Sequence, residues 1–349
     1  MGEGEDILLN YVRKNHWGGG KTLLEKIESI NESINNHYGD SLNLYIRIRD
    51  FVSILYVRLR YKFENKEYYY YHLYSKSASE IREFCPKKIQ ANLYFKVNTE
   101  AARHLATDKY ASYLRFKKYY NRSTVAYNPS ANLINIEDQF HSFIESHPQF
   151  IVKPLDSNSG KGVKIIDSRD VINLCETLKS DYKGGFIAEE LIIQSKELAQ
   201  FHPQSVNTVR INTFNFGDTI EVKFPSMRMG RGEAVVDNAN AGGICGGIDQ
   251  ETGMLIAVGD ELGNHYYEHP DTKIPFNGFV LPRWHEVCEI AKEIASKFPE
   301  CKVIGFDFAL TDNGWCLVEI NAHPLLIFQI ATQTGIMKEM ESIIKRMNV

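Results

Sequence analysis

The stretch "GFDFALTDNGWCLVEINAHP", from Gly305 to Pro324, has the pattern of a β-hairpin. Its turn, "TDNG", ends at Gly314, a residue that adopts the positive φ of such turns without steric cost. If Asn313 is the centre of a three-residue loop, Asp307 lies directly opposite Glu319 on the neighbouring strand. The sequence therefore predicts an antiparallel pair of strands that brings these two carboxylates together.

The face that carries these carboxylates has the composition of a metal site. The two-residue period of a strand puts Asn321 on the face of Glu319. On the first strand, Gly305 and Ala309 share the face of Asp307 and leave room for a ligand. Mg²⁺ takes oxygen ligands of this kind, usually one or two carboxylates completed by phosphate oxygens and water. A polar, solvent-facing side of the hairpin is the alternative. The opposite face is expected to form core through Ile304, Phe306, Phe308 and Leu310.

Upstream, "FIVKPLDSNSGKGVKIID" (residues 150–167) has the pattern of a strand, a loop and a second strand. Walker loops and dinucleotide-binding loops both lead into a helix, so neither motif fits. A loop of small residues between two strands could instead close over a triphosphate through its backbone N–H groups. Lys153, at the end of the first strand, would add a fixed positive charge; a plain hairpin with an exposed lysine is the alternative. The loop residues concerned are Ser157, Asn158, Ser159, Gly160, Lys161 and Gly162.

Two further segments carry charged residues on expected strands. In "GFIAEELII" (185–193), the backbone could bind an adenine edge, and Glu189 or Glu190 could accept hydrogen bonds from ribose hydroxyls. Adjacent residues of a strand face opposite ways, so only one of the two is expected to enter a site. In "SVNTVRINTF" (205–214), Arg210 lies among apolar residues and needs an anionic partner. That partner is either a phosphate or substrate carboxylate, or a structural acid.

The glycine-rich stretch "SMRMGRGEAVVDNANAGGICGGIDQETG" (226–253) is typical of a binding loop over an active site. A surface connector is the alternative, but the arginines and the apolar "AVV" argue against it. The polar residues that could face a ligand are Arg228, Arg231, Asp237 and Asn238.

The composition is that of a globular protein, because 43% of the 349 residues are hydrophobic and 24% are charged. The opening "MGEGEDILLN" is acidic and lacks the apolar core of a signal peptide. No run of about 18 apolar residues predicts a membrane span. Six cysteines are scattered without a CxxC pair, which indicates a reducing compartment and argues against a structural zinc site. The expected location is therefore the cytoplasm.

Residues 1–90 are expected to be mainly helical, because apolar residues recur at three- and four-residue spacing. The segment "SLNLYIRIRDFVSILYVRLRYKF" (41–63) carries four arginines among apolar residues. It could be an interfacial helix, but we favour a core helix whose arginines extend to solvent. The run "EYYYYHLY" (67–74) could stack on sugars or nucleotides, but packing in a helix–helix seam is favoured.

Charge is unevenly distributed along the chain. Residues 1–120 hold 20 Lys and Arg against 14 Asp and Glu, a net charge of +6, within a chain whose total is −4. This half could face an anionic surface or polymer, although a basic solvated face is favoured. The negative total and the lack of a basic stripe argue against a nucleic-acid partner.

Beyond residue 90 the helical pattern continues to about residue 149, and from Phe150 short β-rich segments alternate with helices. Many of the expected strands are joined too tightly for crossover connections. The sequence therefore predicts an α+β fold with mostly antiparallel strands.

In their order along the chain, these motifs resemble the ATP-grasp superfamily over about residues 95–345. The elements are a helix bearing Lys109 in "ATDKYASYL", "FIVKP" with its loop, "IAEELI", a strand arginine, and "GFDF…LVEINAHP". The stretches "EYYYYHLY", "SVNTVRI" and "VDNANAGGI" are similar to the sugar-transfer associated ATP-grasp group, which itself is similar to α-L-glutamate ligase-like proteins. The resemblance implies an ATP-grasp fold of two α+β lobes with ATP between them, at 95–185 and 186–349, preceded by a helical region at 1–94.

The resemblance also implies roles for individual residues. Lys109 and Lys153 would contact ATP phosphates, and Arg210 would lie near the γ-phosphate, with Lys153 and Arg210 as the catalytic pair. The flap over ATP would be formed by Ser159, Gly160, Lys161 and Gly162. The adenine hinge would be Glu189, Glu190, Leu191 and Ile192, with Glu197 as a third candidate for ribose. Mg²⁺, or Mn²⁺ in its place, would be held by Asp307, Glu319 and Asn321. Substrate binding is expected at Arg228, Arg231, Asn238, Gly242 and Gly243.

One departure from the family pattern concerns the N-terminus. Many members begin with a Rossmann-like domain, whereas residues 1–90 carry no glycine-rich βα turn. Recognition of the acceptor is therefore the part of the resemblance that transfers least.

The function that the resemblance implies is an ATP- and Mg²⁺-dependent ligase that joins a carboxylate to an amine, with small-molecule or sugar-linked substrates, in surface polysaccharide or cell-envelope biosynthesis. Such a role would place the protein in the cytoplasm, with contact to the inner face of the membrane as an option. A small-molecule kinase on the same scaffold is one alternative. A nucleotide-binding scaffold without turnover is another.

Overall fold

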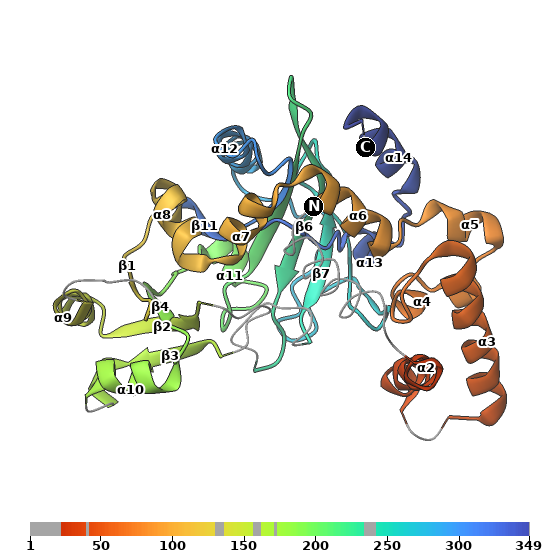
Figure 1. Ribbon diagram of the computed structural model, residues 1–349, viewed down its shortest axis with the longest axis horizontal. Coiled ribbons are helices and arrows are strands. Elements are labelled where there is room, and N and C mark those ends of the chain that lie inside the picture. Colours follow the sequence, from red (N-terminus) through yellow and green to blue (C-terminus); the bar gives the residue numbers. More distant parts are fainter. Residues whose placement is uncertain are drawn as a thin grey trace.

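The computed structural model describes residues 22–39, 42–129, 136–155, 162–170, 173–233 and 242–348 (Figure 1). It contains two sheets, and every strand pair in them is antiparallel. This arrangement confirms the α+β fold expected from the sequence.

The smaller sheet has four strands in the order β1-β4-β2-β3. The strands are β1 (Thr124–Tyr127), β2 (Gln149–Pro154), β3 (Lys164–Asp167) and β4 (Phe186–Glu190). A short 3-10 helix, η2 (Ser168–Asp170), follows β3. One face of the sheet packs on α9 (Ile136–Ser146) and α10 (Leu174–Asp181). That core is built mainly from Phe140, Phe143, Phe150, Phe186 and Leu178. The opposite face is turned toward the rest of the molecule, since Ile187 and Ala126 belong to the largest core.

The larger sheet has seven strands in the order β11-β10-β5-β6-β7-β8-β9. The strands are β5 (Thr208–Asn215), β6 (Ile220–Met229), β7 (Ile244–Ile248), β8 (Leu255–Gly259), β9 (His265–Tyr266), β10 (Val303–Thr311) and β11 (Gly314–Asn321). One face packs on α12 (Trp284–Ser296), and a short helix, α11 (Lys196–Ala199), lies before β5. At the C-terminus, α13 (Phe328–Thr332) packs on β7 and β8, and α14 (Met337–Arg346) closes a further core.

The described part of the N-terminal region is helical, as expected. The helices are α2 (Leu23–Tyr38), α3 (Leu44–Tyr61), α4 (Glu67–Tyr70), α5 (Ala78–Glu83), α6 (Lys87–Val97), α7 (Glu100–Thr107) and α8 (Lys109–Tyr120), with a 3-10 turn, η1 (Leu73–Ser75). Two of them begin with capping boxes, Thr22 with Glu25 and Ser77 with Glu80. Among these helices, none has both the length and the apolar character that crossing a membrane requires.

The tyrosine run packs in a core rather than lying on a surface. Tyr68, Tyr69 and Tyr71 are buried together with Ile54 of α3 and Ile34 of α2. The expected helix–helix seam is therefore confirmed. The expectation for α3 itself is wrong for half of its surface: Asp50, Ile54 and Val57 are buried, but the opposite, apolar face is exposed.

The sheets divide the chain differently from the boundaries expected at 95, 185 and 186. Helices α7 and α8 pack on β11 in the largest core, through Ala102, Ala106, Tyr113, Phe116 and Tyr120. Strand β4 lies beyond the expected boundary but pairs with β1 and β2 of the smaller sheet. The smaller lobe thus runs from about residue 123 to residue 190, as an insertion into the larger lobe.

The hairpin of β10 and β11 has the predicted pairing, but its loop length differs from the prediction. Asp307 lies opposite Glu319, as expected. The loop has two residues instead of three, because Thr311 pairs with Gly314, and a bulge at Val318 restores the register. Gly314 has a φ of 114°, which a side chain would strain. The expected core face is confirmed, since Ile304, Phe306, Phe308 and Leu310 are buried.

Candidate functional site

A row of polar residues crosses one face of the large sheet. In the register, Arg210 of β5 lies between Ser226 of β6 and Asp307 of β10, and Asp307 lies opposite Glu319 of β11. Directly opposed residues of antiparallel strands point to the same face. The sheet therefore brings the strand arginine and the predicted metal ligands together, although they lie almost 100 residues apart in the chain.

The centre of this row is a buried ion pair. Arg210 donates from Nε to Oδ1 of Asp307 over 2.7 Å and from Nη2 to Oδ2 over 2.6 Å. Two parallel bonds of this kind are the strongest geometry for a guanidinium and a carboxylate. Both residues are buried, and the structural acid that the sequence left open as a partner for Arg210 is thus Asp307.

Two more side chains converge on Asp307. Arg228 of β6 places Nη1 at 3.5 Å from Oδ2, and Asn321 of β11 donates from Nδ2 to the same oxygen over 3.4 Å. Burial alone would raise the pKa of Asp307, but the charges of Arg210 and Arg228 outweigh it and lower that pKa. Asp307 therefore stays ionised between two guanidinium groups.

The metal site predicted from the hairpin can be compared with these contacts. Glu319 is half-buried, and among the described residues its carboxylate makes no hydrogen bond or ion pair. Asp307 and Asn321 lie beside it, but both Asp307 oxygens already accept hydrogen bonds from Arg210. In the described parts of the chain, no group of three or more His, Cys, Asp and Glu could hold a metal ion. Two carboxylates and one amide fit Mg²⁺ as an incomplete oxygen set, which phosphate oxygens would complete. The room expected beside Gly305 is partly filled, because a Cβ there would lie 2.7 Å from Pro324 and 3.0 Å from Asn212.

Several buried polar atoms lie near this row. The oxygens Ser226 Oγ, Asn212 Oδ1 and Tyr94 OH have no hydrogen-bond partner among the described residues. Burial raises the pKa of the Tyr94 hydroxyl well above its ordinary value, while the charge of Arg210 lowers it in part. Buried polar groups without partners are costly, so these oxygens mark a place where a polar ligand can be received. Tyr94, on α6, had no signal in the sequence that linked it to the site.

The backbone beside Arg210 is strained. A bulge in β6 shifts its register against β5 between Arg210 and Asn212. Phe224 in this bulge has a φ of 51°, an unusual value for a bulky residue. Its ring is buried against Phe214, which holds the strained conformation in place. Bulges of this kind redirect neighbouring side chains next to sites.

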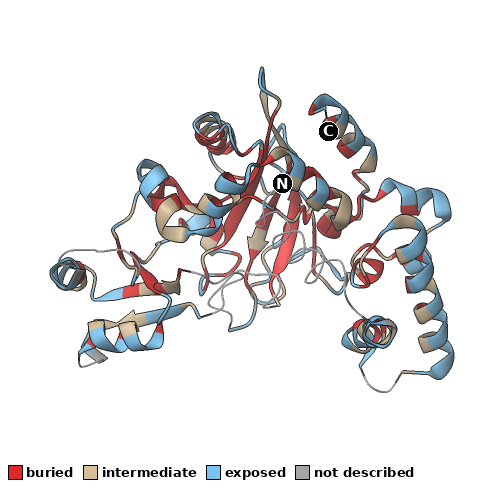
Figure 2. Cartoon of the chain, viewed as in Figure 1, coloured by how far each residue is buried: buried red, intermediate tan, exposed pale blue. Residues whose placement is uncertain are grey.

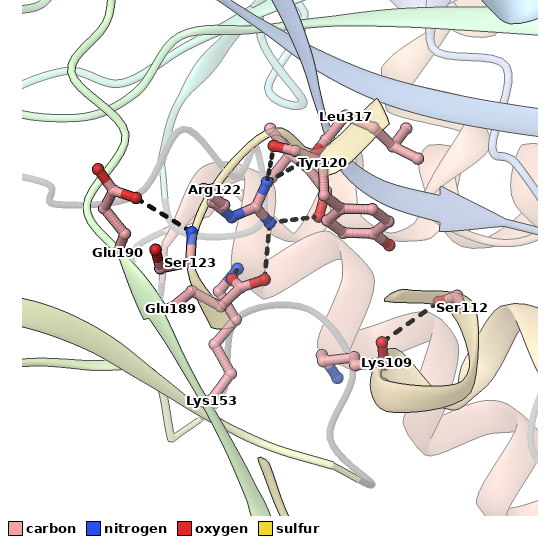
Figure 3. Close-up of polar contacts among 10 residues, drawn as sticks. Lys109, Ser112, Tyr120, Arg122, Ser123, Lys153, Glu189, Glu190 and Leu317 are labelled. Carbon is pink, nitrogen blue, oxygen red and sulfur yellow. Dashed lines mark hydrogen bonds and ion pairs between the residues drawn. The ribbon is translucent and has the colours of Figure 1, made fainter. Parts of the chain in front are cut away.

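A second charge cluster joins the smaller sheet to the larger one (Figure 3). Glu189 of β4 accepts a hydrogen bond from Nη2 of Arg122 over 2.7 Å, and Lys153 of β2 pairs with its other oxygen. Arg122 also donates to the carbonyl oxygens of Leu317 (2.6 Å) and Val318 (3.4 Å), at the bulge of β11. One arginine thus bonds both lobes.

The charges of this cluster are fixed by their mutual contacts. Burial alone would raise the pKa of Glu189, but Arg122 and Lys153 outweigh it and lower the pKa to about 2. The side chain of Lys153 is only 16% exposed, which excludes the alternative of a solvent-exposed lysine. Arg122 was not recognised in the sequence, because its partners lie in strands far along the chain.

The two glutamates of the expected hinge face opposite ways, as predicted. Glu190 accepts a hydrogen bond from the Ser123 N–H over 3.0 Å and lies 3.6 Å from His147. The backbone N–H of Glu190 also donates to the Ser123 carbonyl over 3.0 Å. Ser123, His147 and Arg122 line an open groove of about 810 Å³ between α8, β1 and α9. Of the two acids, Glu189 is committed to cations, so Glu190 is better placed to accept from a ligand.

The other expected nucleotide contacts are placed as follows. Lys109 is half-buried in the first turn of α8 and appears in the same close-up as Lys153 (Figure 3). Leu191 and Ile192 follow β4, and Glu197 is exposed on α11. Gly162 has a φ of 76°, and its carbonyl accepts from the Tyr182 hydroxyl over 2.8 Å. The flap residues Ser157, Asn158, Ser159, Gly160 and Lys161 lie outside the described residues.

The expected substrate residues divide between two networks. Arg228 joins the Arg210–Asp307 pair, as described above. Arg231 instead donates to the Tyr266 hydroxyl over 2.8 Å and lies 3.4 Å from Asp260. Gly242 and Gly243 lead directly into β7. Asp237 and Asn238 lie outside the described residues.

Asn98 is a further residue that sequence reasoning missed. At the end of α6, its Nδ2 donates to the carbonyl oxygens of Val303 (2.7 Å) and Ala322 (2.8 Å). Its Oδ1 accepts from the Val303 N–H over 2.9 Å. One buried amide therefore fixes the start of β10 to the end of β11, next to Asn321.

Comparison with known proteins agrees with these motifs. The model of the sugar-transfer associated ATP-grasp family matches residues 88–345, which confirms the resemblance drawn from the sequence. No curated protein matches the sequence.

Among solved structures, the D-alanine–D-alanine ligase of Helicobacter pylori is 16% identical with a TM-score of 0.45, over 75% of this chain and 67% of that one. The enzyme from Bacillus anthracis is 14% identical with a TM-score of 0.41, over 70% of this chain and 68% of that one. The D-cycloserine synthetase DcsG is 12% identical with a TM-score of 0.45, over 72% of this chain and 73% of that one.

Proposed function

The chain belongs to the sugar-transfer associated ATP-grasp family, and from this premise we propose that it is an ATP- and Mg²⁺-dependent ligase. It activates a carboxylate as an acyl phosphate and joins it to an amine. The observation that carries the proposal is the buried row on the large sheet, where Arg210 and Arg228 surround one ionised Asp307 beside the carboxylate of Glu319.

The two guanidinium groups of this row suit anionic reactants. A substrate carboxylate and a γ-phosphate repel each other, and two guanidinium groups at the meeting point reduce that repulsion. Because Asp307 holds Arg210 by two hydrogen bonds, the guanidinium is oriented before the substrates arrive. Arg228 lies farther from Asp307, so it is the freer of the two to bind a substrate carboxylate.

The nucleotide would lie between the two sheets. Lys153 and Lys109 would contact its phosphates, and the segment from Glu190 to Ile192 would hold adenine and ribose. Glu319 and Asn321, with Asp307, would hold Mg²⁺, which when bound neutralises phosphate charge. The described flap residue Gly162 would lie at the edge of the loop that covers the phosphates.

The chemistry has two steps that balance. A carboxylate oxygen attacks the γ-phosphorus, the bond to the β-phosphate oxygen breaks, and ADP leaves. The amine nitrogen then attacks the acyl carbon, inorganic phosphate leaves with one oxygen of the original carboxylate, and the amine proton passes to solvent. Phosphorylation is needed because oxide is a poor leaving group. Catalysis is mainly positioning and charge neutralisation.

The family and the cysteines support the proposed substrates and location. We place the reaction in surface polysaccharide or cell-envelope biosynthesis, with small-molecule or sugar-linked carboxylates and amines as substrates. All six cysteines are free thiols, which fits a reducing compartment such as the cytoplasm.

The test is an isotope experiment on the purified chain with ATP, Mg²⁺ and panels of amines and ¹⁸O-labelled carboxylates. A ligase yields an amide product and inorganic phosphate that carries one ¹⁸O atom. A small-molecule kinase would instead yield a stable phosphorylated product without labelled phosphate. Nucleotide binding without turnover in every panel would favour a scaffold.

A further inference from the structure

Helix α3 presents a continuous apolar face to solvent. Seven large apolar residues on it are between 40% and 73% exposed, although none is needed to complete a core of the described chain. At 3.6 residues per turn they fall within about 120° of the helix circumference. They are Leu44, Tyr45, Ile48, Val52, Leu55, Tyr56 and Leu59. Figure 2 shows this helix at the margin of the molecule with an exposed outer side.

The opposite face of α3 already anchors the helix to the protein. Ile54 and Val57 are buried in the core of the N-terminal helices, with Tyr68 and Tyr69. The hydroxyl of Tyr69 donates to Asp50 Oδ2 over 3.1 Å. Because this inner face supplies the packing of α3, the apolar outer face has no role in the cores of the described residues. A contiguous apolar surface of this kind marks an interaction site.

Arginines border the apolar face on both sides. On the helix circumference, Arg49 and Arg60 follow one edge, and Arg47 and Arg58 follow the other. Lys62 adds a further cation at the C-terminal end of the helix. The only acid of the helix, Asp50, is on the inner face, where it is buried and paired with Arg49 over 2.7 Å. The outer surface is therefore apolar in the middle, basic at both edges and without an acidic side chain.

We propose that α3 docks on an anionic lipid bilayer, with its apolar face in the boundary between headgroups and acyl chains. Helices with one apolar face and basic borders lie in the plane of such surfaces. The arginines would lie at the level of the lipid phosphates, while their stems continue the apolar face. The proposal does not depend on the ligase chemistry proposed above.

Charge favours a bilayer over a second copy of this chain. If two copies paired through this face, the arginine borders of one would meet those of the other, with no exposed acid of α3 to compensate them. An anionic surface would instead place negative charge next to the arginines on both edges of the apolar face. The distribution of charge along the chain also favours an anionic surface near α3, because residues 1–120 carry a net charge of +6 although the whole chain carries −4.

Docking through α3 would leave the smaller sheet accessible. In Figure 1, α3 and the smaller sheet with α9 and α10 lie at opposite ends of the molecule. The polar row of the large sheet lies between them. A bilayer held at α3 therefore does not cover the smaller sheet.

The experiment measures co-sedimentation of the full chain with vesicles. Wild type is expected to sediment with vesicles of equal parts phosphatidylcholine and phosphatidylglycerol, but not with pure phosphatidylcholine. High salt should weaken the binding, because the attraction is screened. A double variant, Val52→Asp with Leu59→Asp, is expected to lose about tenfold or more in vesicle affinity. A second, Arg47→Gln with Arg60→Gln, is expected to lose about fivefold for each charge removed.

The matched control is Tyr267→Asp, which places the same charge on an apolar residue that is 89% exposed in the larger lobe. It is expected to bind vesicles as wild type does. Four of the replaced residues are exposed and Arg47 is partly exposed. Thermal unfolding should therefore be similar in every variant, and ATP-dependent phosphate release with soluble substrates should also be unchanged.

Three results would overturn the proposal. One is equal binding to neutral and anionic vesicles. Another is retention of vesicle binding by the Val52→Asp, Leu59→Asp variant. The third is a wild type that ignores vesicles but forms dimers in analytical ultracentrifugation, which this variant converts to monomers; the face would then be an interface between two copies.

Discussion

Two buried glutamates of this protein differ in charge at neutral pH: Glu189 is ionised and Glu67 is protonated. Glu189 and Glu67 are both 2% exposed. Glu189 lies between Arg122 and Lys153, and its pKa is lowered to about 2. Glu67 lies among the N-terminal helices, and burial raises its pKa to about 8. Its oxygens accept from the backbone N–H groups of Glu64 and Lys87, while the Lys87 ammonium is paired with Glu64.

The comparison shows that partners, and not burial, decide the charge of a buried acid. The backbone contacts of Glu67 hold a helix junction and work with a protonated carboxyl group. The cations around Glu189 and Asp307 keep both carboxylates ionised. Of these three acids, the two that are ionised lie in the clusters where the proposed nucleotide would be received, and the structural Glu67 is protonated.

The largest effect on stability is expected at Asp307. Asp307→Asn leaves Arg210 and Arg228 facing a neutral side chain, and an uncompensated buried charge costs about 4 kcal/mol in the free energy of unfolding. Urea denaturation measures this loss. The control is Asp312→Asn in the exposed turn of the same hairpin, for which a change within about 0.5 kcal/mol is expected. Equal losses in the two variants would contradict the assignment of Asp307 as the charge centre of the row.

Glu189→Gln is expected to cost about 3 kcal/mol, because Arg122 and Lys153 lose their shared acid. The control is Glu190→Gln, at the next residue, whose side chain is 43% exposed. This change should leave the free energy of unfolding nearly the same.

The pH dependence of stability tests whether Glu189 is ionised in the folded protein. A carboxyl group with a lowered folded-state pKa stabilises the protein above its ordinary pKa of 4.5 and loses that contribution as the pH falls toward about 2. The stability difference between wild type and Glu189→Gln should therefore shrink below pH 4.5. A difference that stays constant would show that Glu189 is not ionised in the fold.

Arg210→Lys tests whether orientation matters at the row. Lysine keeps the charge but cannot form two parallel bonds to Asp307. ATP-dependent phosphate release is expected to fall about 100-fold, measured with the carboxylate and amine that give the fastest turnover. Arg283→Lys is the matched control, since Arg283 makes the same two-bond contact to Glu286 on the surface, at 2.6 and 2.7 Å. A loss of similar size in both variants would assign the effect to stability.

The smallest effect is expected at Glu67. Its pKa of about 8 means that the folded state holds a proton that the unfolded state releases, so wild type loses stability as the pH rises from 4.5 through about 8. Glu67→Gln should change the free energy of unfolding by no more than about 0.5 kcal/mol at pH 4, below the ordinary pKa of glutamate, and should make the protein more stable than wild type at pH 9. Urea denaturation at both values checks this, and a pH-independent difference would show that Glu67 is ionised.

The local parts of this structure could be predicted from the sequence. The pairing of Asp307 with Glu319, the core face through Phe306 and the opposite directions of Glu189 and Glu190 all follow from the two-residue period of strands. The pairing held despite a wrong loop length, because the bulge at Val318 added the residue that the loop lacked. A bulge has no reliable sequence signal, so that agreement depended on a compensation.

The non-local parts could not be predicted. Arg122 follows a helix and precedes β1, a strand that the helical pattern concealed, and its partners lie 67 and 195 residues away. The acid that pairs with Arg210 became known only from the order of strands in the large sheet. For α3, apolar residues on nearly all sides suggested a core helix, and only the packing of α2 and the tyrosine run shows which side is left uncovered.

The hydrogen bonds between Ser123 and Glu190 have a consequence for motion. The chain enters the smaller lobe at Ser123 and leaves it after Glu190, and these two crossings are bonded side by side. Two chain crossings that lie side by side form a line about which we expect the smaller lobe to rotate more readily than it slides or twists. Arg122 lies next to Ser123 on this line, and its hydrogen bonds to the carbonyl oxygens of Leu317 and Val318 fix the line to the larger lobe.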